Sequence, residues 1–493
     1  MPLISKGQGE AESIPLCIDV DGTLLKTDLL FESFLQLIKQ KPWLLPWVPV
    51  WLIQGRACLK QQLAKHASVL GAQFPMHPGL IDFLRSENDN GRPLVLCSGS
   101  DRVLVDKVAA QLALPVEVMA SDGVTNLKGA QKAQALVDRF GLRGFDYAGN
   151  AKEDLPVWRQ ARNAIVVNAT AKVQKAAQEH GNVTMVLPKA TKVIHVLLRA
   201  LRVHQWVKNL LIFVPLLASH NILQLELIGQ TVLAFLSMSL CASSMYVVND
   251  LSDIESDRRH HSKQRRPFAG GELSIPVGLL MAPLLAAGGI ALSLMLPPMA
   301  TAILLCYVLL SAAYTYWLKQ KLLADVITLA VLYTLRIIEG GEATSLLVSP
   351  WLLMFSLFLF LSLAFIKRVA EMIHLAGTTQ HGAAGRGYFV EDTGTLANLG
   401  IASGFLSCLV LSLYINSESV RQLYAHPAWL WLLVPLLLFW VSRLWVITMR
   451  GAMTDDPIVY LSKDTRTYAT IALSSMILML ATSSPVGIPG VLE

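Results

Sequence analysis

The sequence predicts a soluble α/β domain with a doubly wound parallel sheet, followed by an all-α membrane bundle of nine helices. The mean hydropathy is +0.49 and only 15% of the 493 residues are charged, which is too apolar for a soluble protein of this length. Beyond residue 205, apolar runs of about 20 residues recur. Before residue 190, short strand patterns alternate with helical patterns. We therefore expect a soluble domain over residues 1–190 and a membrane domain over residues 191–493.

The soluble part carries three buried-strand patterns separated by helical patterns. The strands are expected at residues 15–18, 93–97 and 164–168, with helices between them at 101–112 and 129–140. Alternation of strand and helix favours parallel strands joined by crossover helices. This pattern predicts the doubly wound sheet.

Polar residues follow the first two strands directly. Asp19 and Asp21 stand in Asp-Val-Asp-Gly-Thr after the first strand, and Ser98 follows the second. In α/β proteins the carboxyl edge of the sheet is where functional side chains gather. These motifs, followed by Lys132 and then by Asp154 in Gly-Asn-Ala-Lys-Glu-Asp, resemble in order the four motifs of haloacid-dehalogenase-like phosphatases.

This resemblance implies specific roles. Asp19 would be the nucleophile that forms an aspartyl-phosphate, and Asp21 the general acid and base. Ser98 and Lys132 would hold the phosphoryl oxygens, because a carboxylate can attack phosphorus only where the accumulating charge is neutralised. Mg²⁺ would be bound by Asp19, Asp21, Asn150 and Asp154.

Asn150 departs from the pattern of the family, which usually has an aspartate there. The asparagine amide oxygen can still coordinate a metal, but the site loses one negative charge. Two interpretations stay open: an active phosphatase, or an inactive domain kept for regulation or assembly.

A helical cap is expected over about residues 30–90. Residues 42–53 read Pro-Trp-Leu-Leu-Pro-Trp-Val-Pro-Val-Trp-Leu-Ile, which is apolar but too short to span a bilayer. Tryptophans with prolines favour contact with a membrane surface or a lipid substrate. The alternative is an ordinary cap core.

Loop charges predict the orientation of the membrane part. The nine expected spans are 207–224, 228–248, 276–294, 298–317, 322–339, 349–366, 396–415, 427–447 and 468–486. Loops after the even-numbered spans, counted together with Arg443 near the end of the eighth span, carry 14 Lys and Arg residues, whereas the opposite loops and the tail carry only Arg421. By the positive-inside rule, the N-terminal domain should lie in the cytoplasm. The membrane is expected to be a bacterial inner membrane.

The acidic run after the second span is the strongest signal in this part. If the helix continues through it, Asp250, Asp253 and Asp257 lie on one face, beside Asn249. Stacked carboxylates favour a hard cation such as Mg²⁺, which can also bind substrate phosphates. The alternative is a solvated acidic helix end. Nine helices with this motif resemble the UbiA-type prenyltransferase superfamily, over about residues 195–490.

The surrounding residues indicate a branch of that superfamily. Most members have a second aspartate-rich motif, but the corresponding stretch here has the single carboxylate Asp325. The remaining pattern resembles the polyprenyl-phosphate phosphoribosyltransferases, of which decaprenyl-phosphate 5-phosphoribosyltransferase is the best-known type. The resemblance implies that the donor is held by Lys208, Lys263, Arg266, Lys319 and Arg336, and the lipid phosphate by Lys367, Arg368 and Arg386. Tyr314 and Asp325 are further expected substrate-binding residues.

Together these expectations describe a bifunctional membrane enzyme with Mg²⁺ in both domains. The membrane domain would transfer 5-phosphoribose from phosphoribosyl diphosphate to a polyprenyl phosphate, and the soluble domain would remove the 5-phosphate. The expected partners are these two substrates and the bilayer, without nucleic acid. Two alternatives remain: an aromatic prenyltransferase for quinone- or haem-type lipids with an accessory phosphatase domain, and a catalytically degenerate membrane scaffold. The oligomeric state and the lipid chain length do not follow from the sequence.

Overall fold

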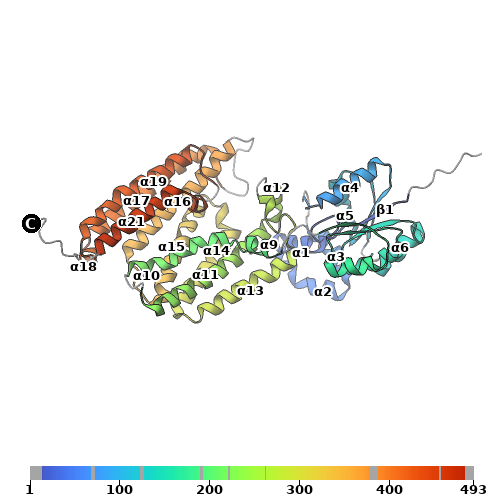
Figure 1. The fold of residues 1–493 in the computed structure, drawn as a ribbon, viewed down its shortest axis with the longest axis horizontal. Coiled ribbons are helices and arrows are strands. Elements are labelled where there is room, and N and C mark those ends of the chain that lie inside the picture. The colour runs from blue at the N-terminus through green and yellow to red at the C-terminus, as the bar shows by residue number, and fades with distance from the viewer. Residues whose placement is uncertain are drawn as a thin grey trace, which may run out of the picture. The chain divides into compact units, whose positions relative to one another are not determined.

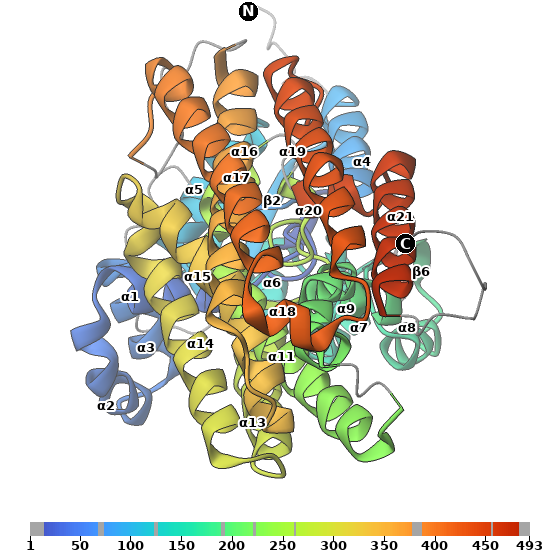
Figure 2. The same cartoon turned by 90° about the vertical axis from the view of Figure 1, so that its left-hand side faces the viewer.

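The computed structural model describes residues 14–67, 73–122, 127–188, 193–219, 223–260, 263–376, 387–454 and 457–482 (Figures 1 and 2). The chain forms two compact units. The first comprises Met1–Leu201 with Tyr246–Ala282, and the second comprises Arg202–Met245 with Pro283–Glu493. Because both units are assembled from separate stretches, the domain boundary at residue 190 stays a prediction.

A six-stranded parallel sheet forms the centre of the first unit, which confirms the predicted α/β fold. The strand order is β3-β2-β1-β4-β5-β6, and every neighbouring pair is parallel. The order reverses at β1, so Asp19 at its end lies where parallel sheets place their ligand sites. The strands are β1 (Leu16–Asp19), β2 (Leu94–Asp101), β3 (Val116–Ser121), β4 (Asp146–Gly149), β5 (Ala164–Val167) and β6 (Val183–Leu187).

Helices cover both faces of this sheet (Figure 1). Alternate residues of a strand point to opposite faces, so Ile18 belongs to one hydrophobic cluster and Cys17 to another. Helices α4 (Pro78–Asp89) and α5 (Arg102–Leu112) pack in the first cluster. The second cluster contains α6 (Ala130–Phe140), α7 (Leu155–Gln160) and α8 (Ala171–Gln178).

Four of the helices between β1 and β2 share a small core of their own and are called the cap below, whereas the cap expected over about residues 30–90 stays a prediction. They are α1 (Leu29–Gln40), the 3₁₀ helix η1 (Pro42–Trp47), α2 (Val48–Ile53) and α3 (Arg56–His66). Their small core contains Leu37, Trp51 and Leu63.

The acidic run is not one continuous helix. Helix α11 (Leu225–Ser252) ends before Asp253, and the short helix α12 (Ile254–Arg259) begins after it. Helical hydrogen bonding nevertheless spans the break, because the Asp253 amide donates to Asn249 O at 2.9 Å and the Asp257 amide donates to Asp253 O at 2.8 Å. The 3₁₀ helix η4 (Lys263–Arg265) follows.

Six helices within the described residues are long and apolar enough to cross a membrane, so the chain is an integral membrane protein. They are α11, α13 (Ile275–Ser293), α14 (Pro298–Tyr316), α16 (Pro350–Ala376), and the segments Val390–Ile415 and Pro427–Met449, which contain α17 (Thr393–Ile415) and α19 (Leu433–Met449). Each coincides with an expected span.

The other three expected spans are helical but differ in character. The first is the shorter apolar stretch Val203–Ala218, built from η3 (Val203–Phe213) and α10 (Val214–Ala218). The fifth, α15 (Ala324–Thr344), carries Asp325, Arg336, Glu339 and Glu342. The ninth is α21 (Thr465–Thr482). The described residues therefore confirm six of the nine spans.

Candidate functional site

The first site lies at the carboxyl end of β1. Asp19 is buried, and its Oδ1 accepts a hydrogen bond from Lys132 Nζ at 2.5 Å. Its Oδ2 accepts from the Thr23 hydroxyl at 3.0 Å. Lys132, on α6, also donates to Cys97 O at 3.1 Å and to the Tyr147 hydroxyl at 3.0 Å. A carboxylate and an ammonium group are thus buried side by side at the sheet edge.

Asp21 lies beside this pair and is held by the strand that follows in the sheet. Its Oδ2 accepts from Ser98 Oγ at 3.0 Å and from Ser100 Oγ at 2.7 Å. Its Oδ1 accepts from the Leu29 amide at the start of α1. The predicted residues Asp21 and Ser98 are therefore brought together, and Ser100 joins them.

Asp154 completes the group from the 3₁₀ helix η2 (Lys152–Asp154), which follows β4. Its Oδ1 accepts from the Tyr147 hydroxyl, and its Oδ2 accepts from the backbone amides of Asn150 and Ala151, all at 2.9 Å. Gly22, with φ of +78°, lies against the Asn150 side chain, because an added Cβ would be 2.2 Å from Asn150 Nδ2. Asn150 thus borders the loop that follows Asp21.

The electrostatics of this site favour a bound cation. Burial raises the pKa of Asp19 to about 7, because Lys132 only partly offsets the loss of solvent and the charges of Asp154 and Asp21. Burial alone would lower the pKa of Lys132, but the neighbouring Asp19 and Asp154 raise it above its ordinary value. Carboxylates outnumber ammonium groups here, so a further cation would relieve their repulsion.

Three residues of this site escaped sequence reasoning: Ser100, Tyr147 and Lys60. Ser100 could have been found from its place two residues after Ser98 on β2. Tyr147 points into the site from β4, but a lone tyrosine in a buried strand gives no signal in the sequence. Lys60, on cap helix α3, donates to Gly99 O at 2.5 Å, a contact that only the folded cap creates.

The second site is the acidic run. Asp250 and Asp257 are 1% and 3% exposed, and both accept from Arg266 Nη1, at 3.1 and 2.6 Å. Burial raises the pKa of Asp257, and the charges of Asp250 and Asp253 add to that effect while Arg266 opposes it. Asp250 and Asp257 therefore meet at one guanidinium despite the helix break, whereas Mg²⁺ binding by these two together with Asp253 stays a prediction. Asn249 and Lys263 are partly buried in the same stretch.

The segment after the acidic run is anchored within the first unit. Arg258 Nη2 donates to Glu32 Oε1 at 2.5 Å and its Nη1 donates to Glu32 Oε2 at 3.2 Å. Glu32, on α1, also accepts from the Thr27 hydroxyl at 2.6 Å. Arg258 Nε donates to Ala269 O. The residue next to Asp257 is thus fixed to the helix that follows Asp21.

Mg²⁺ is the ion that the sequence implies for both acidic sites. Within the part of the chain that the structure describes, no three His, Cys, Asp or Glu side chains are grouped to hold a metal ion. Mg²⁺ needs only one or two protein carboxylates, because water and substrate phosphates supply its other ligands. Asp19 with Asp154, and Asp250 with Asp257, are such pairs, so the donor sets fit this ion.

In the second unit, Tyr314, Asp325 and Arg368 form a closed network. Arg368 Nη2 donates to Asp325 Oδ1 at 3.0 Å, and its Nε donates to Asp325 Oδ2. The Tyr314 hydroxyl donates to Asp325 Oδ1 at 2.8 Å, and Glu371 accepts from Arg368 Nη1 at 2.6 Å. The side chains of Arg368 and Asp325 are 0% exposed. This geometry joins α14, α15 and α16 and shields both charges from solvent.

Two of the predicted basic residues border one aromatic ring, that of Tyr333, and a third lines a small pocket with it. The Arg336 guanidinium lies 5.3 Å from its centroid and Lys208 Nζ lies 5.9 Å from it. Lys367 lines a small pocket with the same tyrosine. Arg336 also donates to Asn209 Oδ1 at 2.8 Å and to the Tyr307 hydroxyl at 3.0 Å. The second unit therefore gathers positive charge around Tyr333.

Two other residues that were predicted to bind substrate are Lys319 and Arg386. Lys319 is half-buried in the 3₁₀ helix η5 (Leu318–Gln320). Arg386 lies outside the described residues.

Glu339 is a buried acid that sequence reasoning missed. It lies one turn after Arg336 on α15, is 0% exposed, and neither of its carboxyl oxygens has a hydrogen-bond partner in the described structure. An unpartnered buried carboxyl is costly, so it calls for a functional explanation. An acid within a predicted span is itself a signal in the sequence.

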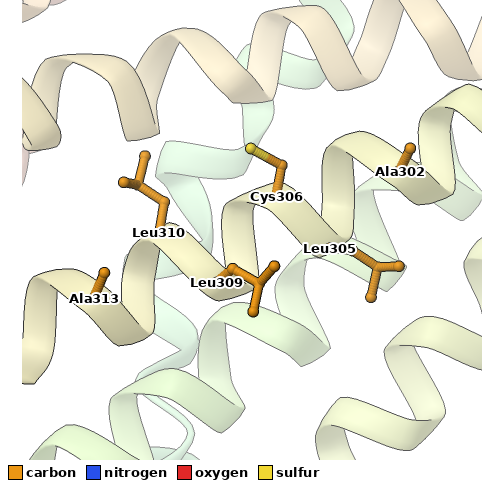
Figure 3. A pocket seen from close by; sticks show the side chains of 6 residues that line it. All are labelled: Ala302, Leu305, Cys306, Leu309, Leu310 and Ala313. Carbon is orange, nitrogen blue, oxygen red and sulfur yellow. The ribbon is translucent and has the colours of Figure 1, made fainter.

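A separate apolar hollow lies along α14 (Figure 3). It is lined by Ala302, Leu305, Cys306, Leu309, Leu310 and Ala313. None of the predicted site residues lines it, so it belongs to the apolar surface of this helix.

The UbiA prenyltransferase family model matches residues 210–456, which is half of the chain. The chain belongs to the UbiA prenyltransferase family. The uncharacterized protein y4nM of Sinorhizobium fredii is 34% identical over 471 residues, covering 95% of this chain and 91% of that protein.

Two further relatives match less of the chain. The nodulation protein NoeC of Azorhizobium caulinodans is 34% identical over 297 residues, covering 58% of this chain and 94% of that protein. A decaprenyl-phosphate phosphoribosyltransferase of Mycobacterium tuberculosis is 34% identical over 201 residues, covering 40% of this chain and 66% of that enzyme. The chain is therefore a UbiA-type protein with phosphoribosyltransferase homologues.

Proposed function

We propose that this protein is a bifunctional enzyme that transfers 5-phosphoribose from phosphoribosyl diphosphate to a polyprenyl phosphate and then removes the 5-phosphate. The observation that supports the first step most strongly is the 34% identity to a decaprenyl-phosphate phosphoribosyltransferase. The second step is supported by Asp19, Asp21, Ser98 and Lys132, which converge at one edge of the sheet. A phosphoribosyl lipid still carries a phosphate ester, and this is the bond that such a site can cleave.

The transfer requires that diphosphate leave the anomeric carbon of the donor. Mg²⁺ bound by Asp250 and Asp257, with Asn249 and Asp253 beside them, would neutralise the leaving diphosphate. Arg266 contacts both buried carboxylates through Nη1. Because a guanidinium has several N–H donors, Arg266 is also proposed to bind a phosphate oxygen. The other proposed donor contacts are Lys208, Lys263, Lys319 and Arg336.

The acceptor is already an anion, so alignment matters more than removal of a proton. Lys367, with Arg386, is proposed to bind the lipid phosphate near the membrane surface. Tyr314, Asp325 and Arg368 have a positioning role in this proposal, because their closed network holds the ends of three helices in register.

In the phosphatase step, an Asp19 oxygen attacks phosphorus and the ester oxygen leaves with a proton from Asp21. Water then attacks the aspartyl-phosphate and returns a proton to Asp21. Lys132 and Ser98 hold the phosphoryl oxygens. Asp154 and Asn150 complete the proposed Mg²⁺ site, where the ion would offset the charge that accumulates at phosphorus.

The proposal places the enzyme in a bacterial inner membrane, with nine membrane spans and residues 1–190 in the cytoplasm. Phosphoribosyl diphosphate is a soluble polyanion, so the transfer site needs access to the compartment that contains it, and the phosphatase site needs access to the lipid product on the same side. The positive loops on one side of the spans support this orientation.

The transfer is tested with membranes that contain the protein, radiolabelled phosphoribosyl diphosphate and undecaprenyl phosphate. We expect the label to enter the lipid extract, and Asp250→Asn to lower its rate at least a hundredfold, whereas the surface control Asp82→Asn leaves the rate unchanged. Absence of lipid-bound label, together with prenyl transfer to 4-hydroxybenzoate, would instead establish the aromatic prenyltransferase alternative.

A further inference from the structure

The cap of the first unit has two different faces. Trp51 is buried with Leu37 and Leu63, and its ring stacks on His66 with 5.8 Å between the centroids. Trp43 and Trp47, from the same apolar run, are 67% and 55% exposed. The run also exposes Val50, Leu52 and Ile53. One tryptophan therefore builds the cap core, whereas the other two lie on its outer surface.

Most of the cap lies in a stretch that carries positive charges but no negative ones. Residues 33–81 contain no aspartate or glutamate but five basic residues. Lys39 and Lys41 directly precede the apolar run, and Arg56 follows it. Exposed tryptophans flanked by basic residues are typical of segments that lie in the headgroup region of anionic membranes. A neutral protein partner would not require the absence of acidic residues over this length.

The same cap reaches the phosphatase site. Lys60, on α3, donates to the carbonyl oxygen of Gly99 at 2.5 Å. Gly99 lies between Ser98 and Ser100, which both donate to Asp21. Burial lowers the pKa of Lys60, while the charges of Asp21 and Asp28 oppose that shift. The exposed apolar run and the lysine that contacts Gly99, between Ser98 and Ser100, thus belong to the same cap.

We propose that residues 42–53 insert into the headgroup region of an anionic bilayer and thereby present lipid-borne phosphate esters to Asp19. This inference rests on the proposed phosphatase function and extends it, because it restricts the substrate class to phosphate esters anchored in a membrane. A chain with six membrane-crossing helices keeps this domain close to a bilayer, so insertion needs no separate recruitment step.

Bilayer contact is measured without reference to activity. The full-length protein is reconstituted into vesicles of phosphatidylglycerol and phosphatidylcholine that contain brominated lipids, and tryptophan quenching is recorded. We expect the double variant Trp43→Phe/Trp47→Phe to lose a measurable part of the quenched signal. That part should shrink when phosphatidylglycerol is omitted or when salt is raised. Equal quenching of the variant and the native protein would overturn the proposal.

Substrate class is measured by comparing two phosphate esters in the same vesicles. The probes are synthetic polyprenyl-phosphoryl-5-phosphoribose and ribose 5-phosphate. For Trp43→Ser/Trp47→Ser we expect the ratio of kcat/KM for the lipid to kcat/KM for the soluble ester to fall about tenfold or more. Leu142→Ser, which changes another exposed apolar residue of the same unit, is the matched control and should keep the native ratio.

The two measurements separate failure of this inference from failure of the proposed function. Quenching that depends on Trp43 and Trp47, without hydrolysis of either ester, would leave the bilayer contact standing and refute the phosphatase function. Hydrolysis of both esters with an unchanged ratio would refute the inference alone. A fall in oligomer mass in the serine variant would mean that a second copy of the chain covers this surface, which also overturns the inference.

Discussion

The pair formed by Glu32 and Arg258 gives a quantitative test of how the acidic run is held. The two side chains are 3% and 4% exposed and approach to 2.5 Å. Removing one partner of a buried ion pair leaves an uncompensated charge and costs about 3–5 kcal/mol. Because 1 kcal/mol shifts the unfolding midpoint of a unit of this size by about 2–4 °C, Arg258→Met should lower it by about 6–20 °C.

The same pair predicts strong non-additivity. Replacing both charges by apolar residues removes the cost of desolvation together with the attraction, and such double replacements are often neutral. Glu32→Leu/Arg258→Met should therefore be more stable than either single variant, so the coupling free energy in a double-mutant cycle should exceed the larger single loss of about 3–5 kcal/mol.

Thermal unfolding of the detergent-solubilised protein, followed by intrinsic fluorescence, provides the assay. Arg85→Met is the matched control, because Arg85 is 63% exposed and lies 3.9 Å from Asp82, also at the surface. This control should change stability by less than about 1 kcal/mol. The reasoning is refuted if Arg258→Met behaves like Arg85→Met, or if the double variant loses the sum of the two single losses.

Three further predictions concern the membrane unit. Glu339→Leu should increase the free energy of unfolding by about 1–3 kcal/mol and raise the unfolding midpoint, because it removes a buried carboxyl without a hydrogen-bond partner in the described structure. A lower midpoint would mean that the carboxyl is paired in the native protein. Arg368→Lys should cost about 3–5 kcal/mol and slow phosphoribosyl transfer, since lysine cannot reproduce the forked contacts with Asp325; a stable, fully active variant would contradict the positioning role. Arg443 and Thr467 hold the pKa of Asp464 at about 2. Because this pKa is about 4 in the unfolded chain, the ionised carboxylate stabilises the fold at pH values above about 4, and this contribution is lost as the pH falls toward 2. Asp464→Asn should therefore narrow the difference between the unfolding midpoints at pH 6 and pH 3, and an unchanged difference would refute the assignment.

Local patterns in the sequence were enough for much of the fold. The strands after which Asp19 and Ser98 stand were predicted because short apolar runs ending in polar residues are distinctive. The order β3-β2-β1-β4-β5-β6 could not be predicted, since it depends on pairings between residues far apart in the chain. For the same reason the contacts that Lys60 and Tyr147 make around Asp19 and Asp21 appear only in the folded protein.

The membrane unit shows where residue type alone is ambiguous. Asp325 and Arg368 were predicted to contact substrate, but a charged residue within a span can equally be satisfied by a partner on the next helix. The structure pairs them with each other. Asp250 and Asp257 were predicted to converge, and they do, although the helix breaks at Asp253 and Arg266 bridges them.

One double-label measurement tests the central claim most directly. Vesicles that contain the full-length protein receive undecaprenyl phosphate and phosphoribosyl diphosphate carrying one radiolabel in the ribose and another in the 5-phosphate. We predict that both labels enter the lipid at equal rates in Asp19→Asn, whereas the native protein retains the ribose label in the lipid and releases the phosphate label as inorganic phosphate. A native lipid product that keeps both labels in equal amounts, or no lipid-bound label in either protein, would contradict this account.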